Sequence, residues 1–339
     1  ALLEGQEEVL SLSIEAASTQ AIGSPTSTLT SLAYMGYIRG LWARLGRRRT
    51  VPLTFLVPEG AGSQMDSTRL RAPVTLRFKP VGACIYCGAT QGRLTEEHIV
   101  PKGLGGTLVL PDSSCDPCAK LTSQFEMRVL RGFLDRGRQS LGIKGRKSHR
   151  RPATESIKQT FIRADNSLVE HDLPWDQSVK VMHLPVLTLP GFLNPKFPPD
   201  PSAEGIEVSA MDTLTMGLGE GEIVREHASV GMQFQDRMDI CSFVRMLAKI
   251  AHGYQVAVHG AFPIEQSPLV PIILGKRWDA RNWIGCTEQD PLPSDRQCLH
   301  LLQDVPLTGG DGSSASMIRI KLFADYPSPT YALAARLQA

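Results

Sequence analysis

Two pairs of cysteines with a histidine between them are the residues of this chain best suited to chemistry. Cys84 and Cys87 form the first pair, Cys115 and Cys118 form the second, and His98 lies between the pairs. Thiolates at these spacings can close a tetrahedral zinc site, in which each sulfur lies about 2.3 Å from the ion. Four sulfurs leave no open coordination position, so the predicted zinc is structural and not catalytic.

The histidine follows two glutamates in the run E-E-H-I-V-P. A neutral imidazole can take a proton from water at physiological pH. Glu97 could supply a hard oxygen ligand to Mg²⁺ or Mn²⁺, and such an ion assists the leaving oxygen of a phosphodiester. A histidine beside two glutamates is also an ordinary surface cluster, but the flanking cysteine pairs favour a reactive site. We therefore expect His98 to act as the general base in phosphodiester hydrolysis.

The elements that must position these residues are predicted in the order strand, turn, strand, helix. Residues 74–78 alternate as a short strand before the first cysteine pair, and residues 107–110 are a second strand candidate. Gly103, Gly105 and Gly106 predict a turn before the second strand. The module is therefore small and rich in loops, and zinc binding would contribute much of its stability.

A helix is predicted to follow the second strand. Asp116 is expected to cap it with its side chain, and Pro117 to occupy its first helical position. Apolar residues recur at helical spacing as far as Phe133, and Gly137 is the predicted stop.

Together these motifs resemble the zinc-bearing branch of the HNH endonuclease family, over about residues 80–135. The resemblance is carried by Cys84-x-x-Cys87, Glu97-His98-Ile99-Val100-Pro101, Leu104-Gly105-Gly106 and Cys115-x-x-Cys118. It implies a ββα-metal fold, in which a hairpin carries the general-base histidine and a helix supplies a metal ligand. His98 matches the base and Glu97 the acidic ligand before it. The implied substrate is DNA rather than RNA.

Two positions depart from the commonest pattern of that family. Leu110 and Pro111 stand where its middle asparagine is expected, and Ala119 follows the last cysteine where asparagine or histidine is usual. Neither role can be carried over to this chain. The metal site therefore needs a ligand from elsewhere, or the module has lost its activity.

Residues on the predicted helix offer such a ligand. Cys118, Thr122 and Glu126 are spaced four residues apart and share one helix face. The run C-A-K-L-T-S-Q-F-E also resembles a bacterial subgroup of HNH-like proteins with threonine and glutamate at these positions. The hypothesis is that Glu126, together with Thr122, replaces the missing ligand. The alternative is that Glu126 is a solvated residue paired with Arg128 or its neighbours.

A basic segment follows this helix face directly. It has nine basic residues against the single acid Asp135: Arg128, Arg131, Arg136, Arg138, Lys144, Arg146, Lys147, Arg150 and Arg151. Lysine and arginine contacts to phosphate dominate nucleic-acid affinity and make it salt-dependent. A charge run is usually a solvated face, but its place beside the predicted site favours phosphate binding. The segment contains no base-reading motif, so it predicts no sequence specificity.

Composition and patterning set the wider frame. The chain has 339 residues, 42% of them hydrophobic and 21% charged, with a formal net charge of +2, as in a soluble globular protein. Residues 1–75 are poorly patterned, residues 76–151 form the predicted zinc module with its basic tail, and residues 152–339 form a C-terminal domain of unknown role. The expected class is α+β, with a small zinc-stapled ββα-metal module followed by a larger mixed α/β domain.

Several elements are predicted in that C-terminal domain. Apolar residues at helical spacing predict a helix over residues 240–254. Residues 180–188 and 269–274 are expected to be strands. Residues 299–305 and 317–323 are expected to pair across a glycine-rich loop. His252, His259 and His300 show no ligand spacing and are expected to be structural or surface residues, and Trp278 and Trp283 to serve packing.

The seven cysteines bear on the compartment. Four lie in the two pairs, which favours metal binding in a reducing compartment over a disulfide framework. Cys241, Cys286 and Cys298 are expected to be buried small apolar residues. No stretch is long and charge-free enough to predict a membrane span. The predicted location is cytoplasmic.

Three functions remain open from the sequence. The leading one is an HNH-type endonuclease that cleaves DNA with Mg²⁺ or Mn²⁺ and carries a structural Zn²⁺. The second is a degenerate zinc module that binds nucleic acid without cleaving it, which the missing asparagine and Ala119 favour. The third is a protein-interaction module on a zinc scaffold, and the basic segment argues against it.

Overall fold

The computed structural model describes most of the chain after residue 74. The described residues are 51–58, 75–143, 156–196, 198–216, 226–287, 291–293, 298–308 and 313–338. Of the predicted N-terminal extension, only residues 51–58 and residue 75 are described. Lys144, Arg146, Lys147, Arg150 and Arg151 of the basic segment lie outside the described residues.

The predicted strand, turn, strand and helix are present around the cysteine pairs, and a further strand that ends at His98 lies before the turn. The elements are β2 (Leu76–Arg77), β3 (Leu94–His98), the 3₁₀ turn η1 (Lys102–Leu104), β4 (Leu108–Cys115) and α1 (Asp116–Arg131). β4 pairs in parallel with β2 and antiparallel with β3, so the three strands form one small sheet. A Cβ atom added at Gly106 would lie only 1.9 Å from the carbonyl oxygen of Val100, so only glycine fits this turn.

The ends of the helix differ from the prediction. Cys115 is the N-cap of α1 and makes no side-chain cap bond, so Asp116 is the first helical residue and not the cap. The helix ends at Arg131, and Gly132 is its C-cap. Gly137, the predicted stop, lies inside α2 (Asp135–Ser140). A side chain there would collide with Met182, so this glycine serves close packing and not helix termination.

The rest of the described chain is built mainly from antiparallel strands. They are β1 (Val51–Pro58), β5 (Ser156–Ile162), β6 (Leu168–Pro174), β7 (Lys180–Leu187), β8 (Val208–Met216), β9 (Gly231–Met238), β10 (Ile284–Cys286), β11 (His300–Thr308), β12 (Ser314–Leu322) and β13 (Thr330–Gln338). One sheet has the order β1-β9-β5-β6, a second has β10-β13-β12-β11, and β7 pairs with β8. The predicted strands near residues 180–188, 299–305 and 317–323 are confirmed.

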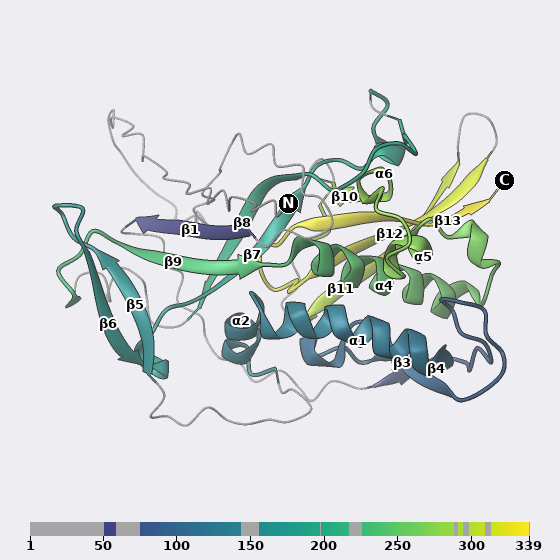
Figure 1. Cartoon of the computed structure of the whole chain (residues 1–339), viewed down its shortest axis with the longest axis horizontal. Coiled ribbons are helices and arrows are strands. Elements are labelled where there is room, and N and C mark those ends of the chain that lie inside the picture. The colour runs from purple at the N-terminus through teal and green to yellow at the C-terminus, as the bar shows by residue number, and fades with distance from the viewer. Residues whose placement is uncertain are drawn as a thin grey trace, which may run out of the picture.

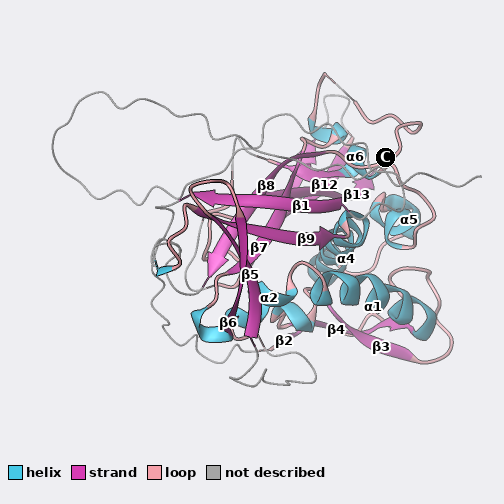
Figure 2. Cartoon of the chain, turned by 60° about the vertical axis from the view of Figure 1, so that its left-hand side comes forward, coloured by secondary structure: helices cyan, strands magenta, loops and turns pink. Residues whose placement is uncertain are grey.

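The helix α4 (Ile240–His259) is buried along most of its length. It packs against α1 on one side and against β12 and β13 on another, as Figures 1 and 2 show. Asp239 caps it by accepting a hydrogen bond of 2.9 Å from the backbone N–H of Ser242. The helix is apolar almost all round, which is typical of a buried helix. Its position places C-terminal residues directly against the small zinc-module sheet.

The predicted strand at residues 269–274 is wrong. The segment forms the short helix α5 (Leu269–Ile273), which packs against α4. A short apolar run does not distinguish a strand from a buried helix. Pro271 is tolerated in the first turn of a helix, where its missing N–H has no partner to lose.

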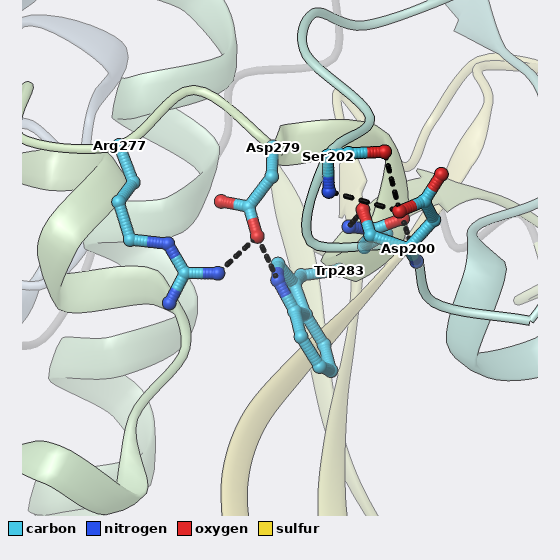
Figure 3. A network of polar contacts seen from close by, with 6 residues as sticks. Asp200, Ser202, Arg277, Asp279 and Trp283 are labelled. Carbon is cyan, nitrogen blue, oxygen red and sulfur yellow. Dashed lines mark hydrogen bonds and ion pairs between the residues drawn. The ribbon is translucent and has the colours of Figure 1, made fainter.

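The tryptophans after α5 serve packing, as expected. Figure 3 shows Asp279 accepting hydrogen bonds from Arg277 and from the indole N–H of Trp283, the latter at 3.0 Å. Trp283 belongs to α6 (Ala280–Trp283), and Trp278 is buried. Across this network Asn282 bonds the backbone N–H and carbonyl of Asp200. Among the described residues, no helix is both long and apolar enough to span a membrane.

Candidate metal centre and hydrolytic site

The four predicted zinc ligands converge at one point. Their sulfur atoms all lie within 4.8 Å of one another, and the Sγ atoms of Cys87 and Cys115 are 3.6 Å apart. A tetrahedron of sulfurs at 2.3 Å from zinc has edges of about 3.8 Å, so the separation fits the ion. Burial raises the pKa of the Cys84 and Cys118 thiols. A bound Zn²⁺ would offset that effect by stabilising the thiolates, and the cluster therefore suggests a structural metal such as zinc.

Local backbone geometry prepares this cluster. The first pair lies in a tight turn, in which the N–H of Gly88 donates to the carbonyl of Cys84 at 2.8 Å. Gly88 has a φ of +75°, which a side chain would disfavour. The second pair joins the end of β4 to the first turn of α1, so the metal would tie the sheet to the helix.

His98 is the last residue of β3 and lies at the edge of this small sheet. Its side chain is 26% exposed, and its Nε2 lies 3.6 Å from Oε1 of the exposed Glu96. Its Nδ1 is buried and has no hydrogen-bond partner among the described residues. Burial lowers the pKa of the imidazole, the charges of Lys249 and Lys102 lower it further, and Glu96 opposes them. The ring is therefore neutral at pH 7 and can accept a proton.

Glu97 and Glu126 meet on a lysine from α4 that the sequence did not single out. The Nζ atom of Lys249 lies 2.6 Å from Oε1 of Glu97 and 2.7 Å from Oε1 of Glu126. It also donates a hydrogen bond to the backbone carbonyl of His98. The Lys249 side chain is only 1% exposed. Glu126 is thus neither solvated nor paired with Arg128, and it shares the ammonium of Lys249 with Glu97.

Electrostatics keep this lysine charged. Burial alone would lower the pKa of Lys249, but the charges of Glu126 and Glu97 outweigh burial and raise it. The phenol of Tyr86 is fully buried, and burial together with the charges of Glu97 and Glu126 raises its pKa well above the usual value. Burial raises the pKa of Glu126, the charge of Lys249 opposes that rise, and the charge of Glu97 adds to it.

Residues 84–133 match the family model of HNH endonucleases. The matched segment contains both cysteine pairs, His98, Glu97 and Glu126, and covers well under half of the chain. No curated protein and no solved structure is significantly similar to the chain. The match supports nuclease function for the HNH segment in general terms. The match does not identify the catalytic residues or the substrate of this chain.

The acid cluster of the HNH segment does not fit a divalent ion as arranged. Mg²⁺ requires oxygen ligands in near-octahedral geometry at about 2.0–2.1 Å and usually keeps several waters. The point between Glu97 and Glu126 holds the ammonium of Lys249 instead. Thr122, the other proposed ligand, is buried, and its hydroxyl donates to the carbonyl of Ala119 within α1.

Other residues of α4 also contact the HNH segment and hold Lys249 against it. One turn further along the helix, His252 donates from Nε2 to the carbonyl of Ile85 at 2.8 Å and bonds Ser267 through Nδ1. Gly253 faces Ile99 so closely that an added Cβ would touch it at 3.7 Å. These contacts confirm a structural role for His252.

The C-terminal sheet makes a second contact of the same kind. His300 on β11 bonds the carbonyl of Leu104 at 2.8 Å through Nε2, and its Nδ1 accepts from the backbone N–H of Phe323. His300 is therefore structural, as expected. His259 at the end of α4 pairs with Asp304 and lies near the surface.

The described part of the basic segment divides into two kinds of arginine. Arg128, Arg131 and Arg136 are exposed. Arg138 is not, because its guanidinium bonds the carbonyls of Leu130 and Gly103 and the carboxylate of Asp135. The geometry gives Arg138 a structural role, which corrects its assignment as a phosphate contact.

Proposed function

We propose that the HNH segment hydrolyses phosphodiester bonds in nucleic acid, with DNA as the substrate and His98 as the general base. The observation that carries this proposal is a neutral, partly exposed imidazole at the end of β3, inside a segment that matches HNH endonucleases. General-base catalysis by a positioned histidine contributes a factor of about 10²–10⁴.

The ring nitrogen that would accept the proton is Nε2. Nδ1 is buried, so the exposed part of the imidazole leaves Nε2 to meet a water molecule. Glu96 lies beside Nε2 and is itself held by Arg77 at 3.0 Å. In the proposed reaction, Nε2 removes a proton from water and the hydroxide attacks phosphorus. The P–O bond to the leaving oxygen then breaks, and that oxygen takes a proton from solvent.

The substrate would be held by exposed positive charge close to the site. Arg128 and Arg131 lie in the last turn of α1, and Arg136 lies on α2. Such contacts neutralise phosphates without reading bases. The four-cysteine zinc would hold β3 and β4 against α1 and take no part in hydrolysis. Reduced cysteines also suit a cytoplasmic location, which is part of the proposal.

A plasmid-nicking assay with the zinc-loaded full chain tests the proposal. His98→Ala should lower the nicking rate by about 10²-fold or more, with zinc content and thermal unfolding unchanged. His259→Ala is the matched control, because it removes a partly exposed imidazole from the far end of α4. The proposal is wrong if the wild-type chain fails to nick DNA in buffers with and without Mg²⁺ and Mn²⁺, or if His98→Ala nicks as fast as the wild type.

A second candidate is a zinc module that binds nucleic acid without cleaving it. Ala119 favours it, because the usual polar residue after the last cysteine is missing. Binding that weakens with salt, without nicking, would select this candidate. In either case the triple change Arg128→Gln, Arg131→Gln, Arg136→Gln should weaken DNA binding. It should also reduce the slope of log K against log salt concentration by the equivalent of up to about three phosphate contacts.

A further inference from the structure

We infer that Lys249 is the resident cation of the HNH segment: its ammonium occupies the point between Glu97 and Glu126 that a divalent ion would otherwise hold, so the centre needs no divalent metal. The position of the ammonium between the two glutamates does not depend on the proposed function. The second claim, activity without divalent ions, rests on the proposed function.

The ammonium of Lys249 is surrounded by oxygen atoms from the HNH segment. A lysine ammonium has three N–H donors. The Nζ atom of Lys249 donates a hydrogen bond to the backbone carbonyl of His98 and lies 2.6 Å from Oε1 of Glu97 and 2.7 Å from Oε1 of Glu126. These oxygens come from β3 and α1, whereas the lysine comes from α4. One oxygen of each carboxylate therefore faces the same cation.

The side chain of Lys249 is enclosed by the protein. On both sides of this residue, α4 is held by specific contacts. Arg245, one turn before, donates twice to the carbonyl of Ile273, and its guanidinium lies 4.7 Å from the centre of the Phe125 ring. His252, one turn after, bonds Ile85. A hydrated divalent ion between Glu97 and Glu126 would therefore have to displace a buried ammonium whose helix is held by contacts on both sides.

Lys180, another buried lysine, lies in a different setting. Its ammonium donates to the backbone carbonyl of Ser178, and burial lowers its pKa. Lys249 instead lies between two carboxylates, Glu97 on β3 and Glu126 on α1. Its site is therefore specific to the cluster and not a common feature of buried lysines in this fold.

Lys249 would act through its neighbours, because it does not touch the position of a substrate. Its bond to the His98 carbonyl fixes the backbone of the proposed base, and its charge balances the acids beneath it. It is thus a positioning residue. Without its ammonium, Glu97 and Glu126 would become a free pair of hard oxygen donors, which is the donor set that Mn²⁺ and Mg²⁺ bind.

Manganese titration of the zinc-loaded full chain, followed by electron paramagnetic resonance of free Mn²⁺, tests this exchange. The wild type should bind no Mn²⁺ at Glu97 and Glu126 below about 1 mM. Lys249→Ala should gain one Mn²⁺ site, and the double change Lys249→Ala, Glu126→Gln should lose it again. Lys321→Ala is the control for deleting a buried lysine elsewhere, and it should gain no site.

The wild-type titration keeps the inference falsifiable even if Lys249→Ala does not fold. Wild-type binding of Mn²⁺ that disappears in Glu126→Gln would overturn it, as would a folded Lys249→Ala that gains no site. Nicking tests the catalytic half separately. In metal-depleted buffer, with zinc content verified, wild-type nicking should match the rate with Mg²⁺, and folded Lys249→Ala should nick only with Mn²⁺ or Mg²⁺. If Mn²⁺ binding follows expectation and no protein nicks DNA, only the proposed function fails.

Discussion

At the scale of single residues, the ion cluster of Lys249, Glu97 and Glu126 dominates the energetics of the site. Removing one partner from a buried ion pair costs about 3–5 kcal/mol, because it leaves an uncompensated charge. Here two carboxylates depend on one ammonium that is 1% exposed. The same charge lies next to His98 and helps to keep its imidazole neutral.

The two acids could be predicted from the sequence, but the lysine could not. Glu97 and Glu126 fall within one short segment, where strand and helix spacing brings their side chains together. Lys249 lies 151 residues beyond His98, and nothing local links them. The one available signal was a charged residue in the apolar helix 240–254, because a buried charge needs a partner. Which partner it finds depends on how α4 packs, and sequence patterns do not give that.

The charge of Lys249 also predicts a pH profile for His98. The base form of the imidazole is needed, so nicking should fall as the pH drops below the pKa of His98. Burial and the positive charges lower that pKa, so the acidic limb should have its midpoint below 6.5. In metal-free buffer, Lys249→Met should raise the pKa of His98 measured by NMR, whereas Lys158→Met, which removes an exposed lysine from β5, should not. A wild-type midpoint above 6.5 would contradict the assignment of His98 as base.

At the scale of elements, α4 carries out two tasks. Its apolar faces fill the core between α1 and the C-terminal sheet, while Lys249 and His252 supply polar contacts to the HNH segment. Periodicity predicted this helix correctly because its apolar residues repeat over five turns. Periodicity failed for α5, whose five residues are too few to show a period. Gly137 failed as a helix stop because its small size serves contact with Met182.

The contact from His252 to Ile85 predicts that acid weakens the attachment of α4. Burial lowers the pKa of His252 to about 4, below the unfolded value of 6.5. The native state therefore holds it neutral, and its contribution is complete above pH 6.5 and lost as the pH falls from 6.5 to 4. The loss should be about 3 kcal/mol, at 1.36 kcal/mol for each pKa unit. Urea unfolding at several pH values should show a smaller acid loss in His252→Gln than in the wild type.

A matched variant separates this effect from general acid sensitivity. His259→Gln removes an imidazole from the exposed end of the same helix and should keep the wild-type difference between pH 6.5 and 4. Equal acid losses in His252→Gln and the wild type would mean that His252 is charged in the folded protein.

At the scale of the whole molecule, one hydrophobic core joins the HNH segment to the rest of the chain. It includes Tyr86 and Ile99 of the segment, Leu247 of α4 and Tyr331 of β13. The sequence predicted the α+β class, because both kinds of periodicity occur. It did not predict that the zinc module would share its core with residues that follow it by more than a hundred positions. Such contacts depend on long-range packing, for which one sequence carries no local signal.

That shared core makes the effect of zinc loss on the whole molecule predictable. Structural zinc contributes about 10–16 kcal/mol in small modules, which matches or exceeds the stability of a typical domain at about 5–15 kcal/mol. Cys118→Ser should therefore abolish zinc binding and unfold residues 84–133, which exposes α4 on the side of Lys249. The sheet of β10, β13, β12 and β11 has its own strand pairing and should persist.

Hydrogen exchange should show lost protection in α1, β3 and β4 but retained protection in β12 and β13. Cys298→Ser, which lies outside the cluster, should leave the zinc content and the protection of all five elements unchanged. Wild-type protection of α1 in a zinc-free Cys118→Ser protein would mean that the core, and not the metal, holds the HNH segment together.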